Sequence, residues 1–174
     1  GSFRKAKAIG MIMANAYDAF ASAYDALNSD ADYTAMADHI DKVFARSNIP
    51  RSSLVLDLGC GTGMLTRELD ARGYDMTGVD SSEEMPGKAY ENSAQSGKIL
   101  YLCQDITEFE LYGTVAAAVC TTDTLNHLTD DESVAKVFSL LHNYLDPGGI
   151  FIFDVNSEYK FSSVYGQNDY VLED

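Results

Sequence analysis

The pattern of apolar and polar positions along the chain changes between short strand-like runs and helical spacing. The clearest change lies at the LVLDLGCGTG segment. Residues 54–58, LVLDL, form a short apolar run that leads into the glycine-rich residues 59–63, which predicts a buried strand followed by a tight turn. In the next segment, 64–73, apolar side chains recur at helical spacing and stop at Gly73, which suits a helix C-terminal cap. The pattern therefore predicts a strand, a glycine loop and a helix in succession.

The same alternation of short apolar runs and helical segments continues as far as residue 155. The further predicted strands are DMTGVD (75–80), KILYLCQD (98–105), TVAAAVCTTD (114–123) and GIFIFDV (149–155). Ser81 or Ser82 can cap a helix after the second strand. Five strands separated by helices predict a doubly wound, mostly parallel α/β sheet, in which ligands bind beyond the carboxyl ends of the strands.

Further helices are predicted at both ends of this pattern. The last one covers 132–145, ESVAKVFSLLHNYL, and the DPGG turn at 146–149 ends it. Its apolar face consists of Val134, Val137, Phe138, Leu141 and Leu145. Before the first strand, two helices are predicted around 16–27 and 33–46, separated by the polar NSDAD turn and ended by Pro50.

Composition narrows the classes of function. The 174 residues suffice for one domain with a hydrophobic core. Lys and Arg number 12 against 27 Asp and Glu, a net charge of −15, which argues against a nucleic-acid-binding surface. The apolar runs are much shorter than the roughly 20 residues of a membrane span, and no secretory signal is recognisable, so no membrane association is expected. Three cysteines without a CxxC pair indicate reduced thiols in a cytoplasmic protein.

The glycine loop points to a class of ligand through the acid that precedes it. A phosphate-binding loop of the GxxxxGK[ST] type is excluded because the required Lys does not follow Gly63. The spacing is G-x-G-x-G and not the dinucleotide pattern G-x-G-x-x-G, and the carboxylate of Asp57 would repel a pyrophosphate. Asp80, at the end of the next strand, can accept hydrogen bonds from both hydroxyls of a ribose. A ligand with a ribose and a cationic amino-acid tail fits both acids, and S-adenosylmethionine is the common one.

Five ordered motifs resemble the class I S-adenosylmethionine-dependent methyltransferases: VLDLGCGTG, GVDSSEEM, CQDITEF, CTTDTLNHL and GGIFIFDVN. The likeness covers about residues 15–156, and FASAYDALNSDADY before the first strand is similar to a group of small bacterial methyltransferases of poorly defined substrate. The resemblance implies a Rossmann-like fold with a helical lid segment in 1–50, a cofactor-binding α/β core in 51–156, and the start of a C-terminal part in 157–174.

The resemblance also implies a set of cofactor-binding residues by position. They are Tyr24, Tyr33, Asp57, Gly59, Gly61, Gly63, Asp80, Ser81, Met85, Asp105, Ile106 and Thr121. The family pattern assigns Asp57, Gly59, Gly61 and Thr121 to the methionine tail, Asp80 to the ribose, and Met85, Asp105 and Ile106 to the adenine.

Two features depart from the family pattern. The MPG sequence at 85–87 is an unusual start for the helix after the second strand. The family sheet has two further strands, and the sequence ends at VLED before either of them, so the apolar IFIF strand would be an open edge that invites association. We therefore expect either that the chain is a piece of a longer protein or that a partner, such as a second copy, covers this edge.

Methyl transfer from a sulfonium requires mainly alignment of the nucleophile and exclusion of water, so no strong catalytic signature is expected. His127, after the fourth strand, is the candidate general base, and the alternative is a histidine packed at a helix start. No role is assigned to His39 and His142. Tyr24 and Tyr33 could offer hydroxyls to the methionine carboxylate and a ring face to the sulfonium, or could be core residues of the N-terminal helices.

The cysteines also allow two interpretations. Cys60, Cys103 and Cys120 lie at or just beyond strand ends, where ligands are expected. Their spacing contains no recognised pair of metal ligands, so they are interpreted as buried small apolar residues. The alternative is a thiolate cluster for a soft metal or metalloid.

The sequence therefore predicts an S-adenosylmethionine-dependent methyltransferase that acts on a small-molecule acceptor, without a metal site or a nucleic-acid partner. Asp123, Asn126 and Asp154 are candidates for substrate contact, although Asp and Asn also cap helices. The alternatives are a non-catalytic module that binds the cofactor or a partner, and a nicotinamide-dependent oxidoreductase, which the G-x-G-x-G spacing and Asp57 disfavour.

Overall fold

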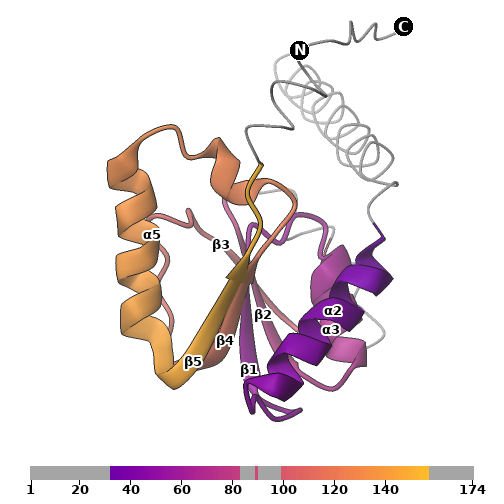
Figure 1. The fold of residues 1–174 in the computed structure, drawn as a ribbon. Helices are drawn as coiled ribbons and strands as arrows, with labels where there is room; N and C mark the ends of the chain where they lie inside the picture. The colour runs from indigo at the N-terminus through magenta and orange to yellow at the C-terminus, as the bar shows by residue number, and fades with distance from the viewer. Residues whose placement is uncertain (1–31, 83–88, 90–98, 157–174) are drawn as a thin grey trace, which may run out of the picture.

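The computed structural model describes residues 32–82, 89 and 99–156, and these form a parallel sheet with helices on both faces (Figure 1). The strands are β1 (Leu54–Leu58), β2 (Asp75–Asp80), β3 (Leu100–Cys103), β4 (Val115–Cys120) and β5 (Leu145–Phe153). Their order in the sheet is β3-β2-β1-β4-β5, and every pairing is parallel. The predicted doubly wound α/β fold is therefore confirmed.

The central strand β1 pairs with β2 on one side and with β4 on the other, so both of its faces are covered. Val55 packs in the core on the face of α2 (Tyr33–Arg46) and α3 (Met64–Ala71). Leu56 and Leu58 pack in a second core on the opposite face, beneath α5 (Asp131–Tyr144). Burial on both faces explains why the strand is a nearly continuous apolar run. Asp57 is the exception, and it points toward α3.

Helix α2 has the bounds that the sequence pattern predicts for 33–46. It begins where the side chain of Asp32 accepts a hydrogen bond from the backbone N–H of Ala35 at 2.8 Å, which is an N-cap. Ile40 and Phe44 are buried at helical spacing, and the ring of Phe44 meets that of Tyr74 edge-on with 5.1 Å between centroids. The helix is thus held to the sheet by apolar packing along one face.

Two predictions about the segment from 132 to 155 are wrong. Helix α5 ends at Tyr144 and β5 begins at Leu145, so Leu145 belongs to a strand and not to the apolar helix face. The DPGG turn lies inside β5, where the pairing with β4 shifts register between Val115 and Ala117. An edge strand tolerates a proline at such an irregularity, and Gly148 adopts a φ of 83°, which is accessible to glycine. Strand β5 is therefore longer than the predicted GIFIFDV.

Strand β5 is the edge of the sheet among the described residues, since it pairs only with β4. Phe151 and Phe153 stack with 5.0 Å between ring centroids, and Phe138 of α5 meets both of them edge-on. The side chains of Phe138 and Phe153 each remain 43% exposed. Phe138 is therefore only partly covered, whereas Val137 and Leu141 of the same helix are buried as predicted.

Several predicted features fall outside the part of the chain that the structure describes. These are the helix around 16–27 with Tyr24, most of the helix after Ser82 with Met85, and residues 157–174. Within the described ranges, none of the helices has the length and apolar character needed to cross a bilayer.

Replacement of Phe44 by alanine is expected to destabilise the fold by about 3–5 kcal/mol, because it leaves a cavity between α2 and the sheet. Urea unfolding followed by circular dichroism measures the change. The half-buried Val43, one position earlier on the same helix, provides the control, and Val43→Ala should cost much less. Equal losses in the two variants would contradict the packing described for α2.

Candidate functional site

The glycine loop after β1 is held by backbone hydrogen bonds to the end of β2. The N–H groups of Gly59 and Cys60 both donate to the carbonyl oxygen of Val79, at 2.7 and 3.0 Å. The N–H of Gly61 donates to Oδ2 of Asp80 at 2.9 Å. Gly59 and Gly61 have φ values of 71° and 52°, a region that glycine enters without steric cost. The glycines therefore allow the backbone conformation in which the loop bonds the end of β2.

Asp80 links the loop to the segment that follows β2. Its Oδ1 accepts the N–H of Ser82 at 3.0 Å, while Oδ2 accepts the N–H of Gly61. An ionised carboxylate offers about four lone-pair positions, so two backbone bonds leave capacity on each oxygen. Asp80 is half-buried and lines a cavity, which lets this remaining capacity serve a ligand hydroxyl.

The larger of two adjoining cavities at this end of the sheet has a volume of about 280 Å³. Its lining consists of Gly59, Asp80, Ser81, Asp105, Ile106, Thr122, Thr124, His127 and Leu128. Oδ1 of Asp105 accepts hydrogen bonds from the N–H and the hydroxyl of Thr107, both at 2.7 Å. These bonds lower the pKa of Asp105, which is therefore an anion at neutral pH. The buried Ile106 adds an apolar wall beside it.

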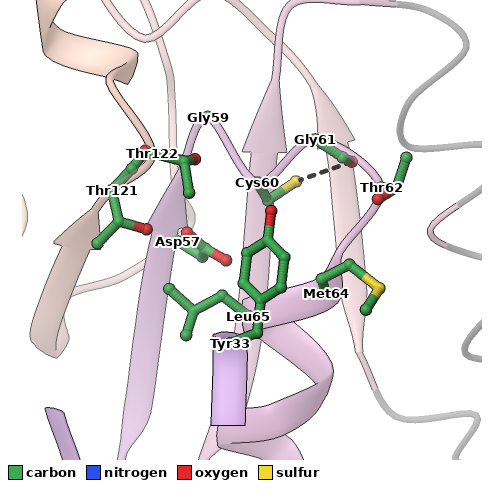
Figure 2. Close-up of a pocket in the computed structure, with 10 residues that line it drawn as sticks. All are labelled: Tyr33, Asp57, Gly59, Cys60, Gly61, Thr62, Met64, Leu65, Thr121 and Thr122. Carbon is green, nitrogen blue, oxygen red and sulfur yellow. Dashed lines mark hydrogen bonds between the residues drawn. The ribbon is translucent and has the colours of Figure 1, made fainter. Parts of the chain in front are cut away.

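The smaller cavity has a volume of only about 10 Å³ and shares Gly59 and Thr122 with the larger one. Its lining is Tyr33, Asp57, Gly59, Cys60, Gly61, Thr62, Met64, Leu65, Thr121 and Thr122. The ring of Tyr33 extends from the start of α2 toward the glycine loop (Figure 2). The space left between the ring and the loop is about that of one water molecule.

Asp57 forms the buried acidic wall of the smaller cavity. Its side chain accepts a hydrogen bond from the hydroxyl of Thr66 at 2.6 Å, and the residue is 2% exposed. Burial raises the pKa of Asp57 to about 6, the bond from Thr66 opposes this rise, and the nearby Asp80 adds to it. The group is mainly ionised at neutral pH, and neither cavity has a Lys or Arg among its described lining residues. The arrangement therefore favours a ligand with positive charge near Asp57.

The loop after β4 closes the site from the other side. Thr122 and Asp123 have φ values of 56° and 65°, which non-glycine residues seldom adopt. The carboxylate of Asp154, just after β5, accepts their two N–H groups at 2.9 and 3.2 Å and so supports this conformation. Thr124 lies against Gly59 so closely that a Cβ at position 59 would overlap its side chain. The conformation of the glycine loop and that of the loop after β4 therefore depend on each other.

The three proposed substrate contacts hold this loop together. Asn126 donates from Nδ2 to Oδ1 of Asp123 at 3.1 Å and accepts the N–H of Asn156 at 3.2 Å. Asp154 bonds the backbone of the loop, as described above. Their visible role is therefore to fix the short 3-10 helix η1 (Thr124–His127) beside the glycine loop.

The cysteines divide into two kinds. Cys60 and Cys120 are buried, and burial together with the charge of Asp57 raises the pKa of both thiols, which keeps them protonated. Cys103 at the end of β3 is exposed, so the prediction that all three are buried is wrong for this residue. It lies at the end of a sheet-edge strand, where fewer neighbours cover it. No group of three His, Cys, Asp or Glu side chains suited to a metal ion occurs in residues 32–82, 89 and 99–156.

The structure brings most of the sequence-predicted site residues together. The smaller cavity contains Tyr33, Asp57, Gly61 and Thr121, the larger contains Asp80, Ser81, Asp105 and Ile106, and Gly59 borders both. Gly63 borders neither cavity, because it starts α3 and packs against Tyr101. His127 is exposed and lines the larger cavity, whereas His39 and His142 are exposed on helices outside both linings.

Sequence reasoning missed several residues that build the site, besides Met64 and Leu65 at the start of α3. The others are Thr62, Thr66, Thr122, Thr124 and Leu128. The position of Thr66 could have been found from the strand-loop-helix pattern, because the first turns of α3 must face the end of β1. The N–H of Thr122 bonds Asp154 and the side chain of Thr124 lies against Gly59. Both neighbours are distant in the sequence, and no local signal indicates them.

Comparison with known proteins gives consistent results. Residues 55–149 match a family model described as a methyltransferase domain. The chain is 35% identical over 159 residues to the putative methyltransferase YqeM of Bacillus subtilis (strain 168), which is 91% of this chain and 62% of that protein. It resembles the crystal structure of an S-adenosylmethionine-dependent methyltransferase from Clostridium acetobutylicum ATCC 824, with a TM-score of 0.80 and 35% identity, over 91% of this chain and 65% of that one. The chain thus spans less than two thirds of either relative.

A more distant likeness concerns the fold alone. The glycopeptide N-methyltransferase MtfA complexed with S-adenosylmethionine is 24% identical, with a TM-score of 0.62, over 71% of this chain and 54% of that one. It shares the architecture of the sheet and its helices.

Replacement of Asp57 by asparagine is expected to stabilise the ligand-free fold at pH 7.5 by about 1–3 kcal/mol. The folded-state pKa of about 6 lies above the ordinary aspartate value of 3.8, so ionisation of Asp57 lowers stability as the pH rises between those values. The advantage of the variant should therefore be full above pH 6 and vanish toward pH 4. Thermal unfolding at a series of pH values measures it. A constant difference across the series would show that Asp57 does not carry this cost.

Proposed function

We propose that this chain, which belongs to the class I S-adenosylmethionine-dependent methyltransferases, takes part in methyl transfer from S-adenosylmethionine to a small-molecule acceptor. The observation that carries the proposal is the pair of adjoining cavities around the glycine loop, one bordered by Asp80 and the other by the buried Asp57. A carboxylate can accept hydrogen bonds from both hydroxyls of a ribose, and a nearby anion stabilises a cationic tail. Asp80 and Asp57 offer these two groups in the two adjoining cavities.

The larger cavity would hold the adenosine half of the cofactor. Asp80 has acceptor capacity for the ribose hydroxyls after its two backbone bonds. Asp105 and Ile106 offer a polar and an apolar wall suited to an adenine, and Ser81 lies beside the ribose end. The volume of about 280 Å³ and the mixed lining support this assignment.

The smaller cavity would hold the methionine tail near Asp57, Gly59, Gly61 and Thr121. A volume of about 10 Å³ is too small for this tail, so the ring of Tyr33 has to rotate for the tail to enter. After rotation, Tyr33 would still lie beside the tail and could contact it through its hydroxyl or its ring. Asp57 would favour the cationic groups of the tail, since it has no basic side chain opposite it within the described lining.

The sulfonium supplies an activated methyl group when the cofactor is bound. The work left to the chain is to orient the cofactor, to exclude water and to admit the acceptor. His127 lies on the larger cavity, so it could take a proton only from an acceptor that extends over that cavity. We assign no other base.

The proposed organisation follows from the same site. Residues 51–156 would form the cofactor-binding core, and Tyr33 of the preceding segment would add its side chain to the site. We place the protein in the cytoplasm, because its three cysteines are free thiols. A chain that bound the cofactor and methylated no acceptor would instead be the non-catalytic binding module.

Binding of S-adenosylmethionine and of its demethylated product S-adenosylhomocysteine by calorimetry tests the proposal. Asp80→Ala should weaken both about 10-fold or more, because it removes charged acceptors for the ribose. Asp75→Ala, at the exposed opposite end of the same strand, is the control and should leave affinity unchanged. Binding of NADH in place of both ligands would favour an oxidoreductase, and equal affinity of the Asp80 variant would remove this residue from the site.

We also propose that the open edge of β5 is a contact surface. In the isolated chain, a second copy would bind there. The strand has no neighbour beyond β4 among the described residues, and its exposed end carries Phe153. Phe153→Lys should lower self-association in sedimentation velocity, because a charge at the edge opposes strand pairing. Leu100→Lys adds the same charge at an exposed position of β3, at the other end of the described strand order, and should lower it less. A wild-type chain that stays monomeric at high concentration would contradict this proposal.

A further inference from the structure

Helix α2 is attached to the rest of the protein by two arginines at different points along its length. Arg51, before β1, pairs with Asp41 at 2.9 Å, in the middle of the helix. Arg72, which follows α3, pairs with Asp38 at 2.6 Å and reaches the first turn. The two pairs also differ in burial, since the side chain of Arg51 is 64% exposed and that of Arg72 is 15% exposed.

Arg72 uses all three nitrogens of its guanidinium. Nη1 donates to the carbonyl oxygen and to Oε2 of Glu68, at 2.6 and 2.7 Å, within its own helix region. Nε and Nη2 donate to Oδ1 of Asp38, and Nη2 also donates to the carbonyl oxygen of Thr34 at 3.1 Å. A planar fork with five N–H groups can satisfy these acceptors together, and a lysine cannot.

The contact with Thr34 lies next to the cofactor-site residue of α2. Tyr33 is the residue before Thr34, and its ring reaches the glycine loop (Figure 2). Arg72 therefore fixes the backbone from which the Tyr33 ring extends. The first turns of α2 also pack on the sheet through Tyr33, Met36 and Ala37. The buried Phe44, the ion pair of Arg51 and the hydrogen bond from Tyr74 to Asp41 at 2.8 Å lie farther along the helix.

We propose that Arg72 is a positioning residue for the methionine half of the cofactor site, because it holds the first turn of α2 so that Tyr33 remains beside the glycine loop. The inference rests on the proposed function. With the backbone of α2 held, rotation of the Tyr33 side chain alone would open the smaller cavity and bring the ring against the tail. Without Arg72, the first turn would lose this polar anchor and keep its apolar packing through Met36 and Ala37, and the Tyr33 ring would be held less firmly beside the loop.

Binding of S-adenosylhomocysteine and of adenosine to four chains tests the inference by calorimetry. The chains are the wild type, Arg72→Lys, Tyr33→Leu and the double variant. Arg72→Lys should weaken S-adenosylhomocysteine about fivefold in the wild-type background and less than about twofold in the Tyr33→Leu background, because the arginine acts through the tyrosine. Adenosine lacks the tail, so its affinity should be the same in all four chains.

Two further variants separate positioning from general stabilisation. Arg51→Lys alters the other attachment of α2 and should leave both affinities unchanged. Asp38→Asn removes the charged partner at an exposed position and should weaken S-adenosylhomocysteine as Arg72→Lys does, which keeps the test open if Arg72→Lys unfolds. Circular dichroism establishes that each variant is folded.

The outcomes distinguish failure of the positioning role from failure of the proposed cofactor site. Additive effects of Arg72→Lys and Tyr33→Leu, or tighter binding by the Arg72 variant, would overturn the positioning role while the cofactor assignment stood. Equal weakening by Arg51→Lys would also overturn it, since any attachment of α2 would then do. A wild-type chain that binds neither ligand would overturn the proposed function and this inference with it.

Discussion

The hydrogen bond from the N–H of Gly61 to the carboxylate of Asp80 joins two segments on which the whole site is built. Strand β1 and the glycine loop come from one βα unit, and Asp80 ends the strand of the next. Without this bond and the two that Val79 accepts, the loop would have many accessible paths, because its glycines restrict the backbone little. With them, the loop borders both cavities in one defined shape.

The buried acid beneath the loop has an opposite effect on stability. Asp57 occupies a position on β1 that an apolar side chain could fill, and its ionised form is disfavoured by burial and by Asp80. Thr66 supplies one hydrogen bond, which compensates only in part. A charge kept at this cost is easier to explain by a ligand than by the fold, and a cationic ligand would supply the missing partner. Stability and ligand binding therefore make different demands on this residue.

The sequence predicted the sheet and helix α2 well because each rests on a local pattern. Strand β1 is buried on both faces and α2 on one face, and the apolar positions in 54–58 and 33–46 follow these two patterns of burial directly. The error at β5 has the opposite cause, since Pro147 and the two glycines have the composition of a turn, and only the pairing with β4 places them in an irregular edge strand. The family resemblance places Gly63 with the cofactor-binding glycines, whereas in the structure it packs against Tyr101. Similarly, the exposure of Cys103 follows from its place on the edge strand β3.

The sequence by itself determined the order of strands and helices along the chain, the place of the glycine loop, and the positions of the two acids, Asp57 and Asp80, from which we infer the class of ligand. These depend on residues close together in the chain, where periodicity and backbone preference are visible. Only the tertiary structure decided which side chains face which cavity, how Asp154 supports the loop after β4, and how Arg72 reaches the backbone beside Tyr33. Those contacts join residues about 30 to 40 positions apart, and sheet register and helix packing set their geometry without leaving a local mark in the sequence.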